Sequence, residues 1–359
     1  MNPAQIEAVF SGQRRDAKAV LLRLLLSCAA PIYAGGSILN RLRYDLKLSP
    51  AHRTNVPVIS IGNITTGGTG KTPFAAFIVK SLQAQGKQPG IASRGYKSLD
   101  NHSSALTENN ATGNDEKLVL DQSCPGTPHL QNRNRVEAAR QLVTEHACDC
   151  VILDDGFQHR RLHRDLDIVL IDAVNPFGYG HLLPRGLLRE PLSSLARADL
   201  LVITRTEQVS AEDILQIQNQ LTRYSNNTPV VEIAFEPTGL IDQHGNQSPI
   251  ANQPKKPLMF CGIGNPIGFS RLLEGLNYEV TPNQNFFVFP DHHHYTQSEV
   301  NQLCDSARQA GTTQLLTTHK DIVKLTDKLP PEITCQAICI EAVIKNGNKV
   351  LDQKLADIF

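Results

Sequence analysis

The 359-residue sequence contains no tryptophan, and aromatic residues make up only 5% of it. Proteins that bind single-stranded nucleic acid stack the bases on aromatic side chains, so we expect no such platform here. An excess of charge of one sign is also missing, because 35 basic residues balance 35 acidic residues. A chain-wide surface for nucleic acid or another polyanion is therefore not expected.

The eight cysteines do not form a C-x-x-C pair. The closest spacings, Cys148-x-Cys150 and Cys335-x-x-x-Cys339, lack the further ligands that a zinc site requires. We expect free thiols in a reducing compartment. The N-terminus also lacks the basic start, apolar run and cleavage site of a secretory signal peptide. These features predict a protein that is cytosolic or lies on the cytosolic side of a membrane.

The chain is too long for one ordinary core, and its length predicts two domains. Its composition of 40% hydrophobic and 19% charged residues is typical of a soluble globular protein. We expect an N-terminal helical segment over residues 1–53 and a larger α/β core over 54–225. A smaller C-terminal α/β domain is expected over 226–359.

Residues 17–40 form an apolar helical pattern with basic flanks. Arg23 and Pro31 interrupt it, so it falls short of the roughly 20 clean apolar residues that a spanning helix requires. Residues 1–53 hold eight basic and three acidic residues, which suits the interface of an anionic inner leaflet. The pattern favours contact with a membrane surface over a single spanning helix. The alternative is an ordinary helix packed on the core, with its basic residues in solvent.

A glycine-rich turn follows the β-branched run Val58–Ile61 and ends in Gly70-Lys71-Thr72. Apolar residues then recur at helical spacing from Phe74 to Leu82. Strand, glycine loop, Gly-Lys-Thr and helix is the layout of a P-loop. In a P-loop, backbone N–H groups and the positive end of a helix surround phosphate oxygens. The stretch therefore predicts nucleotide binding.

The P-loop chemistry assigns roles to two side chains. Lys71 is expected to reach the β- and γ-phosphates, and the Thr72 hydroxyl is expected to hold Mg²⁺. The strict pattern G-x-x-x-x-G-K-[ST] has glycine at position 65, where this chain has Thr65. A chance glycine-rich turn is the alternative interpretation.

Two adjacent aspartates, Asp154-Asp155, end the apolar run Cys150–Leu153. An apolar strand that ends in aspartate downstream of a P-loop is the Walker B arrangement, and carboxylates suit Mg²⁺; a turn with a helix cap is the alternative. Arg94 and Tyr96 follow another strand and should lie near the P-loop. Strands near 58–61, 88–93, 150–154, 167–172 and 200–204 alternate with helices and loops, which predicts a parallel, doubly wound sheet.

The C-terminal part begins with residues 226–254, which we expect to be a polar, turn-rich connection. Strands are expected near 257–261, 285–289 and 314–317, and helices near 269–275 and 298–310. Gly262 and Gly264 form a G-x-G that lacks the third glycine of a dinucleotide site, so it is a weak signal.

Three consecutive histidines, His292 to His294, follow Asp291. Neighbours in sequence seldom converge on one ion, so a metal site is disfavoured. An Asp–His pair for proton transfer is the preferred interpretation, because histidine titrates near neutral pH.

This set of motifs resembles the tetraacyldisaccharide 4′-kinases, which phosphorylate the lipid A precursor on the cytoplasmic face of the inner membrane of Gram-negative bacteria. The resemblance covers roughly residues 56–325. Its motifs are Ser60-Ile61-Gly62-Asn63, Gly67-Gly68-Thr69-Gly70-Lys71-Thr72-Pro73, Ser93-Arg94-Gly95-Tyr96-Lys97, Leu153-Asp154-Asp155-Gly156-Phe157-Gln158-His159-Arg160, Arg164-Asp165-Leu166, Leu188-Arg189-Glu190-Pro191, Gly262-Ile263-Gly264-Asn265-Pro266, Phe289-Pro290-Asp291-His292 and Thr317-Thr318-His319-Lys320-Asp321.

The resemblance implies an ATP-dependent kinase that phosphorylates the 4′-hydroxyl of an acylated disaccharide 1-phosphate. It implies a catalytic Asp115 paired with His292, and Mg²⁺ near Thr72 and Asp154-Asp155. Arg189 is a further candidate for neutralising phosphate charge. The loop lacks a glycine at position 65 in this family too. The expected phosphate-binding residues are Thr65, Thr66, Gly67, Gly68, Thr69, Gly70, Lys71 and Thr72.

The chain departs from the family pattern at two motifs. It has Asn114-Asp115-Glu116-Lys117 where the family usually has Gly-Asp-Glu-Pro, and Thr318-His319-Lys320-Asp321 where the family has Thr-Glu-Lys-Asp. Asp115 and His292 fall in different predicted domains, so domain closure is expected to assemble the site and exclude water.

Two other functions compete with this interpretation. A P-loop switch ATPase or GTPase would act on a protein partner, but Thr204-Arg205-Thr206-Glu207 does not match the guanine-reading N-K-x-D. A soluble small-molecule kinase would leave the N-terminal segment unexplained. We expect an acylated lipid and the inner-membrane surface as partners, and no obligate protein partner.

Overall fold

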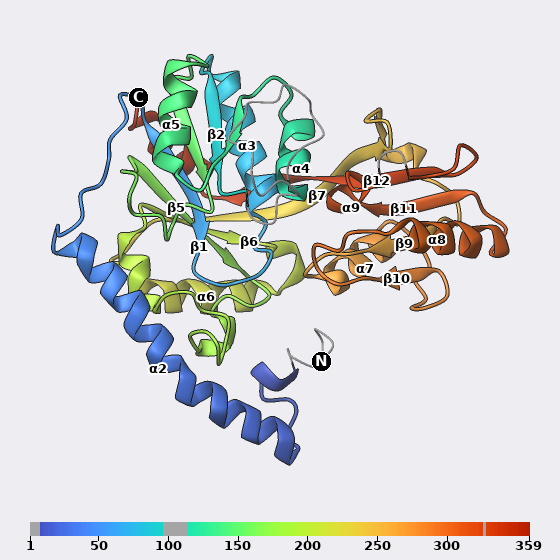
Figure 1. The fold of residues 1–359 in the computed structure, drawn as a ribbon, viewed down its shortest axis with the longest axis horizontal. Coiled ribbons are helices and arrows are strands. Elements are labelled where there is room, and N and C mark those ends of the chain that lie inside the picture. The colour runs from blue at the N-terminus through green and yellow to red at the C-terminus, as the bar shows by residue number, and fades with distance from the viewer. Residues whose placement is uncertain (1–7, 96–113, 326–327) are drawn as a thin grey trace.

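The computed structural model describes residues 8–95, 114–325 and 328–359. A single 12-stranded sheet crosses the molecule in the order β10-β9-β11-β12-β7-β6-β5-β1-β4-β2-β3, with β8 paired to β7 (Figure 1). In this order, neighbouring strands are parallel from β7 through to β3, and they are also parallel from β10 through to β12. The predicted α/β class with a mostly parallel sheet is therefore confirmed.

The N-terminal part of the sheet forms the P-loop lobe. Alternate residues of its strands face opposite sides, where α3 with α10 covers one face and α5 with α6 covers the other. This is a doubly wound arrangement. The elements are β1 (Val58–Asn63), α3 (Lys71–Ala84), β2 (Pro89–Ser93), α4 (Asp115–Ser123), β3 (His129–Gln131), α5 (Arg135–Thr144), β4 (Cys150–Asp154), β5 (Leu166–Asp172), β6 (Leu200–Thr204) and α6 (Ala211–Thr222), with 3₁₀ turns at Gly178–Gly180, Leu192–Arg197 and Thr206–Gln208.

The remaining strands and helices form the second lobe and the connection to it. Helices α7 and α8 pack on the strands of this lobe (Figure 1). The elements are β7 (Val230–Asp242), β8 (Gln247–Pro249), a 3₁₀ turn at Ile250–Asn252, β9 (Leu258–Cys261), α7 (Pro266–Gly275), β10 (Phe286–Val288), α8 (Gln297–Gln309), β11 (Gln314–Thr318), α9 (His319–Ile322), β12 (Thr334–Asn346) and α10 (Asn348–Ala356).

Strands β7 and β12 connect the two lobes as a long antiparallel pair of 13 residues each. The expectation of a turn-rich connection is wrong for residues 230–242. Pro237 and Gly239 suggested turns, but they flank a shift in the β7–β12 register, where a bulge accommodates both residue types.

The lobes have separate apolar cores that meet at α4. Leu120 packs in the core that contains Phe74 of α3, whereas the adjacent Val119 packs with Tyr295 of the second lobe. Helix α10 lies within the predicted C-terminal domain, yet its Leu351 and Leu355 complete the core of the P-loop lobe. The end of the chain thus returns to the first lobe.

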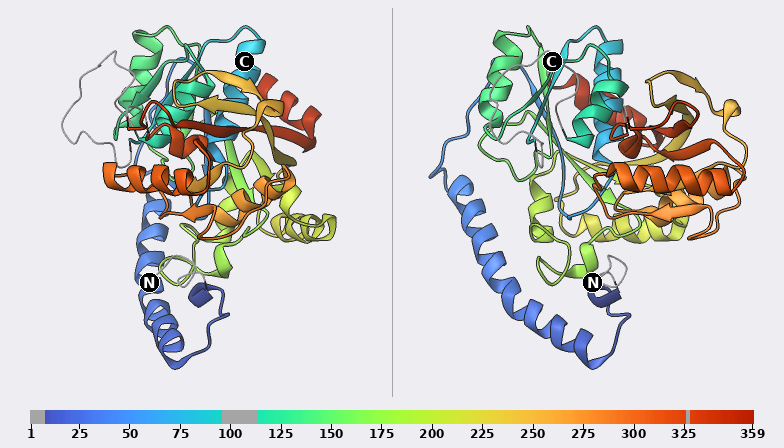
Figure 2. Two further views of the ribbon diagram at one scale, coloured as in Figure 1. Left: turned by 90° about the vertical axis from the view of Figure 1, so that its right-hand side faces the viewer. Right: turned by 45° about the vertical axis from the view of Figure 1, so that its right-hand side comes forward.

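Helix α2 (Ala17–Asp45) is continuous through Pro31 and lies on the outside of the molecule (Figures 1 and 2). Among the helices that the structure describes, it alone has the length and apolar composition to cross a membrane, and 6% of its apolar window is buried. Arg23 lies within the helix, and its guanidinium donates to the carbonyl oxygens of Val9 and Arg14 at 3.3 and 2.6 Å.

Candidate active site

The backbone of the phosphate loop adopts conformations that favour glycine. Gly70 caps the N-terminus of α3 with φ of 83°, and a Cβ there would lie 2.2 Å from the Phe235 ring. Gly67 has φ of 115°. Thr65 does not have a positive φ, and it forms an antiparallel bridge with Leu188. Position 65 therefore has no conformational need for glycine.

One side of the loop is held by residues 187–189. The Leu187 carbonyl accepts a hydrogen bond from the Thr66 N–H at 2.7 Å. The Arg189 N–H donates to the Ile64 carbonyl at 2.7 Å. This pairing places the Arg189 side chain beside the phosphate loop.

The other side is held from the end of β6. The Thr204 hydroxyl donates to the Thr69 carbonyl at 3.0 Å. Arg205 bridges the Gly68 carbonyl and the Asp172 carboxylate. In the sequence these residues showed only a mismatch to N-K-x-D, so their contribution to the shape of the loop was missed.

Asp155 joins the two basic residues predicted to bind phosphate. Its carboxylate oxygens both lie 2.9 Å from Arg189 Nη1, and Lys71 Nζ lies 3.5 Å away. Burial acts to raise the pKa of Asp155, but Lys71 and Arg189 outweigh it and hold the pKa below its usual value. Asp155 is therefore an ionised carboxylate that is paired with two cations.

Asp154 is in a different environment although it is the adjacent residue. It ends β4, is 5% exposed, and its Oδ1 has no hydrogen-bond partner among the described residues. Burial, followed by the nearby Glu116 carboxylate, raises its pKa to about 7. A buried carboxylate oxygen without a partner fits a site for a hard divalent cation.

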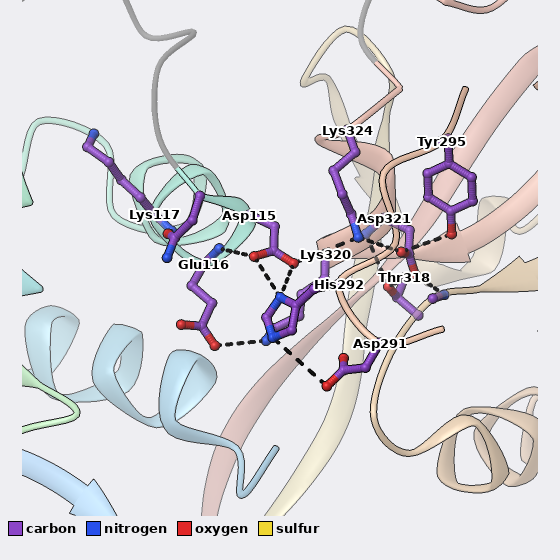
Figure 3. Close-up of polar contacts among 12 residues, drawn as sticks. Asp115, Glu116, Lys117, Asp291, His292, Tyr295, Thr318, Lys320, Asp321 and Lys324 are labelled. Carbon is purple, nitrogen blue, oxygen red and sulfur yellow. Dashed lines mark hydrogen bonds and ion pairs between the residues drawn. The ribbon is translucent and has the colours of Figure 1, made fainter. Parts of the chain in front are cut away.

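Asp115 and His292 lie in contact although 177 residues separate them (Figure 3). His292 Nδ1 lies 2.9 and 3.0 Å from the two Asp115 oxygens. Burial opposes ionisation of Asp115, yet His292, Lys320 and Lys324 lower its pKa to about 2. The same hydrogen bond raises the pKa of His292. The structure thus brings together the two residues that the resemblance paired.

A buried carboxylate in the second lobe holds the loop that carries His292. Asp321 accepts from the Gly262 N–H at 2.9 Å, the Tyr295 hydroxyl at 3.0 Å and the Thr318 hydroxyl at 2.7 Å. Lys324 Nζ lies 3.0 Å from the same carboxylate (Figure 3). The His292 N–H in turn donates to the Gly262 carbonyl at 3.2 Å.

The two lobes are joined by the motif Thr318-His319-Lys320-Asp321. No role could be assigned to this motif from the sequence. Lys320 Nζ lies 3.1 Å from Glu116 Oε1 of α4. His319 Nε2 lies 2.8 Å from Gln122 Oε1 of the same helix. The motif was the one sign of these contacts in the sequence. It did not identify their partners, because those residues are distant in the chain.

The phosphate loop and the Asp115–His292 pair line one cleft of about 2270 Å³. Arg94 also lines it, as expected, whereas Tyr96 lies outside the described residues. Tyr33 of α2 reaches the same cleft.

The neighbouring histidines do not gather at one point. His293 Nε2 lies 3.0 Å from Glu299 Oε1. Within residues 8–95, 114–325 and 328–359, no group of three His, Cys, Asp or Glu side chains is arranged to hold a metal ion.

The fold and this cleft define a P-loop phosphate-binding protein with a second lobe that supplies part of the site. The family model for tetraacyldisaccharide-1-P 4′-kinase matches residues 22–359. The chain belongs to this family.

Similar proteins extend over most of the chain. The tetraacyldisaccharide 4′-kinase of Anaeromyxobacter dehalogenans strain 2CP-C is 36% identical over 342 residues, which cover 92% of this chain and 89% of that protein. The protein of the same name from Halothermothrix orenii is 36% identical, with 89% and 87% covered. The crystal structure of LpxK from Aquifex aeolicus in complex with ATP superposes with a TM-score of 0.73 at 26% identity, covering 94% of this chain and 99% of that one.

The Asp115–His292 pair makes stability depend on pH. The raised pKa of His292 contributes stability that is complete below its ordinary value of 6.5 and is lost as the pH rises through the raised value. The lowered pKa of Asp115 contributes stability that is present above its ordinary value of 3.8 and is lost as the pH falls toward about 2.

We predict that His292→Gln lowers the free energy of unfolding most between about pH 4 and 6.5, and less at higher and lower pH. Urea titrations of wild type and variant in one detergent, at several pH values, measure the difference. A difference that stays constant across pH would contradict the pairing.

Proposed function

We propose that this protein transfers the γ-phosphate of ATP to the 4′-hydroxyl of the tetraacyldisaccharide 1-phosphate precursor of lipid A. Membership in the kinase family supports the reaction. The observation that carries the site assignment is the single cleft lined by the phosphate loop, Asp115 and His292.

We assign the ATP phosphates to residues 65–72, with Lys71 and Arg189 neutralising their charge. Asp155 keeps both cations in place before the nucleotide arrives. Mg²⁺ would be held by the Thr72 hydroxyl and by Asp154, whose Oδ1 has no other described partner. The ion would neutralise charge on the β- and γ-phosphates. This assignment divides the two adjacent aspartates between different roles.

We assign acceptance of the hydroxyl proton to Asp115 together with His292. The carboxylate is ionised, and it can accept a hydrogen bond from the 4′-hydroxyl. Because Asp115 raises the pKa of His292, the pair is a better proton acceptor than the carboxylate alone. Closure of the two lobes around the bound substrates would exclude water, which limits ATP hydrolysis.

We place α2 on the cytoplasmic face of the inner membrane. Its exposed apolar residues include Leu24 and Ile32, which are 59% and 80% exposed. The helix is fastened to the site, because the Tyr33 hydroxyl donates to the Arg189 carbonyl at 3.1 Å. Arg160 Nη1 also lies 2.7 Å from Asp45 at the end of the helix. The same element can therefore hold acyl chains near the membrane and position the catalytic loop.

The function is tested by incubating the protein with ATP labelled in the γ-phosphate and the tetraacyldisaccharide 1-phosphate in detergent. Label should enter the lipid, and Lys71→Ala should abolish the transfer because the phosphates lose their principal cation. Lys349→Ala, which changes an exposed lysine on α10 far from the cleft, should transfer normally. Label released only as inorganic phosphate would instead favour a P-loop switch, and wild-type transfer by Lys71→Ala would contradict the phosphate site.

The link between α2 and the site is tested by Tyr33→Phe. Loss of one hydrogen bond is worth about 0.5–1.5 kcal/mol, so we predict a roughly 2- to 10-fold lower kcat/KM for ATP. Tyr44→Phe on the same helix is the matched control. Equal activity of the two variants would show that the Tyr33 contact does not position Arg189.

A further inference from the structure

The helix that carries Asp115 has little apolar anchoring of its own. Helix α4 has nine residues, and Val119 and Leu120 are its buried residues. A helix of this length is not stable in isolation. Its position, and with it the position of Asp115, must be fixed by contacts with its surroundings.

Edge strand β3 holds α4 at two points. His129 Nδ1 lies 3.1 Å from Asp121 Oδ1, and Gln131 Nε2 donates to Asn114 Oδ1 at 2.9 Å. His129 and Gln131 are two residues apart, so they lie on the same face of the strand. Asn114 and Asp121 are seven residues apart, so they lie on one side of the helix, two turns from each other.

The His129 side chain that contacts Asp121 also contacts strand β2 of the sheet. His129 Nε2 lies 2.9 Å from the hydroxyl of Ser93, which ends β2. An ionised Asp121 only accepts hydrogen bonds, so Nδ1 carries the hydrogen and Nε2 accepts from Ser93. Burial lowers the pKa of His129, so the imidazole remains neutral near pH 7. This fixes the direction of both hydrogen bonds.

The second contact is made at the start of the helix. Asn114 is the N-cap, and its Oδ1 accepts from the Lys117 N–H at 3.0 Å as well as from Gln131. Asp115 is the next residue along the chain. A shift of the cap therefore moves the Asp115 carboxylate directly.

We propose that His129 and Gln131 are positioning residues that hold α4 so that Asp115 meets His292 and the acceptor hydroxyl. The proposal rests on the role proposed above for Asp115. Ser93, His129 and Asp121 anchor the C-terminal half of α4, and Gln131 with Asn114 anchors its beginning. Neither His129 nor Gln131 lines the cleft.

Steady-state kinetics of the full-length protein with ATP and the lipid acceptor test the proposal. His129→Ala and Gln131→Ala should each lower kcat roughly 10-fold or more, because misplacement by 1 Å can cost about 10²-fold. The KM for ATP should not change, since the phosphate loop is untouched. Asp121→Asn keeps an acceptor for Nδ1–H and should retain most of the activity. Gln141→Ala on α5 is the matched control.

The same substitutions in an Asp115→Ala background separate positioning from general destabilisation. If His129 and Gln131 act through Asp115, Gln131→Ala and His129→Ala should cause no further loss of kcat in that background. Losses that multiply in that background would overturn the positioning role of His129 and Gln131 while leaving the role of Asp115 intact. Wild-type turnover by Asp115→Ala alone would overturn both. If His129→Ala fails to fold, Gln131→Ala carries the test.

Discussion

The contact between Asp115 and His292 is the interaction on which the arrangement of the molecule depends. The two residues belong to different lobes and meet at 2.9 Å. Helix α4 is packed between the two cores and carries the carboxylate, whereas buried Asp321 holds the loop that carries the imidazole. Strands β7 and β12 join the lobes so that both sides face one cleft.

The protein's own side chains arrange the charges of the cleft. Asp155 is paired with Lys71 and Arg189, so two cations are held beside the phosphate loop. Asp154 is buried beside them and keeps one oxygen without a described partner. We propose that Asp155 orders the cations and that Asp154 is left to bind Mg²⁺. The different environments of these adjacent carboxylates make that division physically reasonable.

Local patterns predicted the local parts of this structure. The strand, glycine turn and helix around Lys71 follow from residue types over a short stretch, as does the strand that ends at Asp154. Strand β7 was missed because Pro237 and Gly239 suggest turns, and only pairing with β12 makes a bulged strand favourable there. The pairing of Asp115 with His292 came from the family resemblance, because no periodicity relates residues so distant in sequence. The contacts of His129, Gln131, Arg205 and Asp321 were also missed, since their partners are set by tertiary structure.

The central claim is that Asp115 and His292 act as one unit contributed by two lobes. The most direct measurement is kcat for lipid phosphorylation by Asp115→Ala, His292→Ala and the double variant, with saturating ATP and lipid. We expect the double variant to be about as slow as the slower single variant, because either substitution alone disables the unit. Losses that multiply in the double variant would show that Asp115 and His292 act independently.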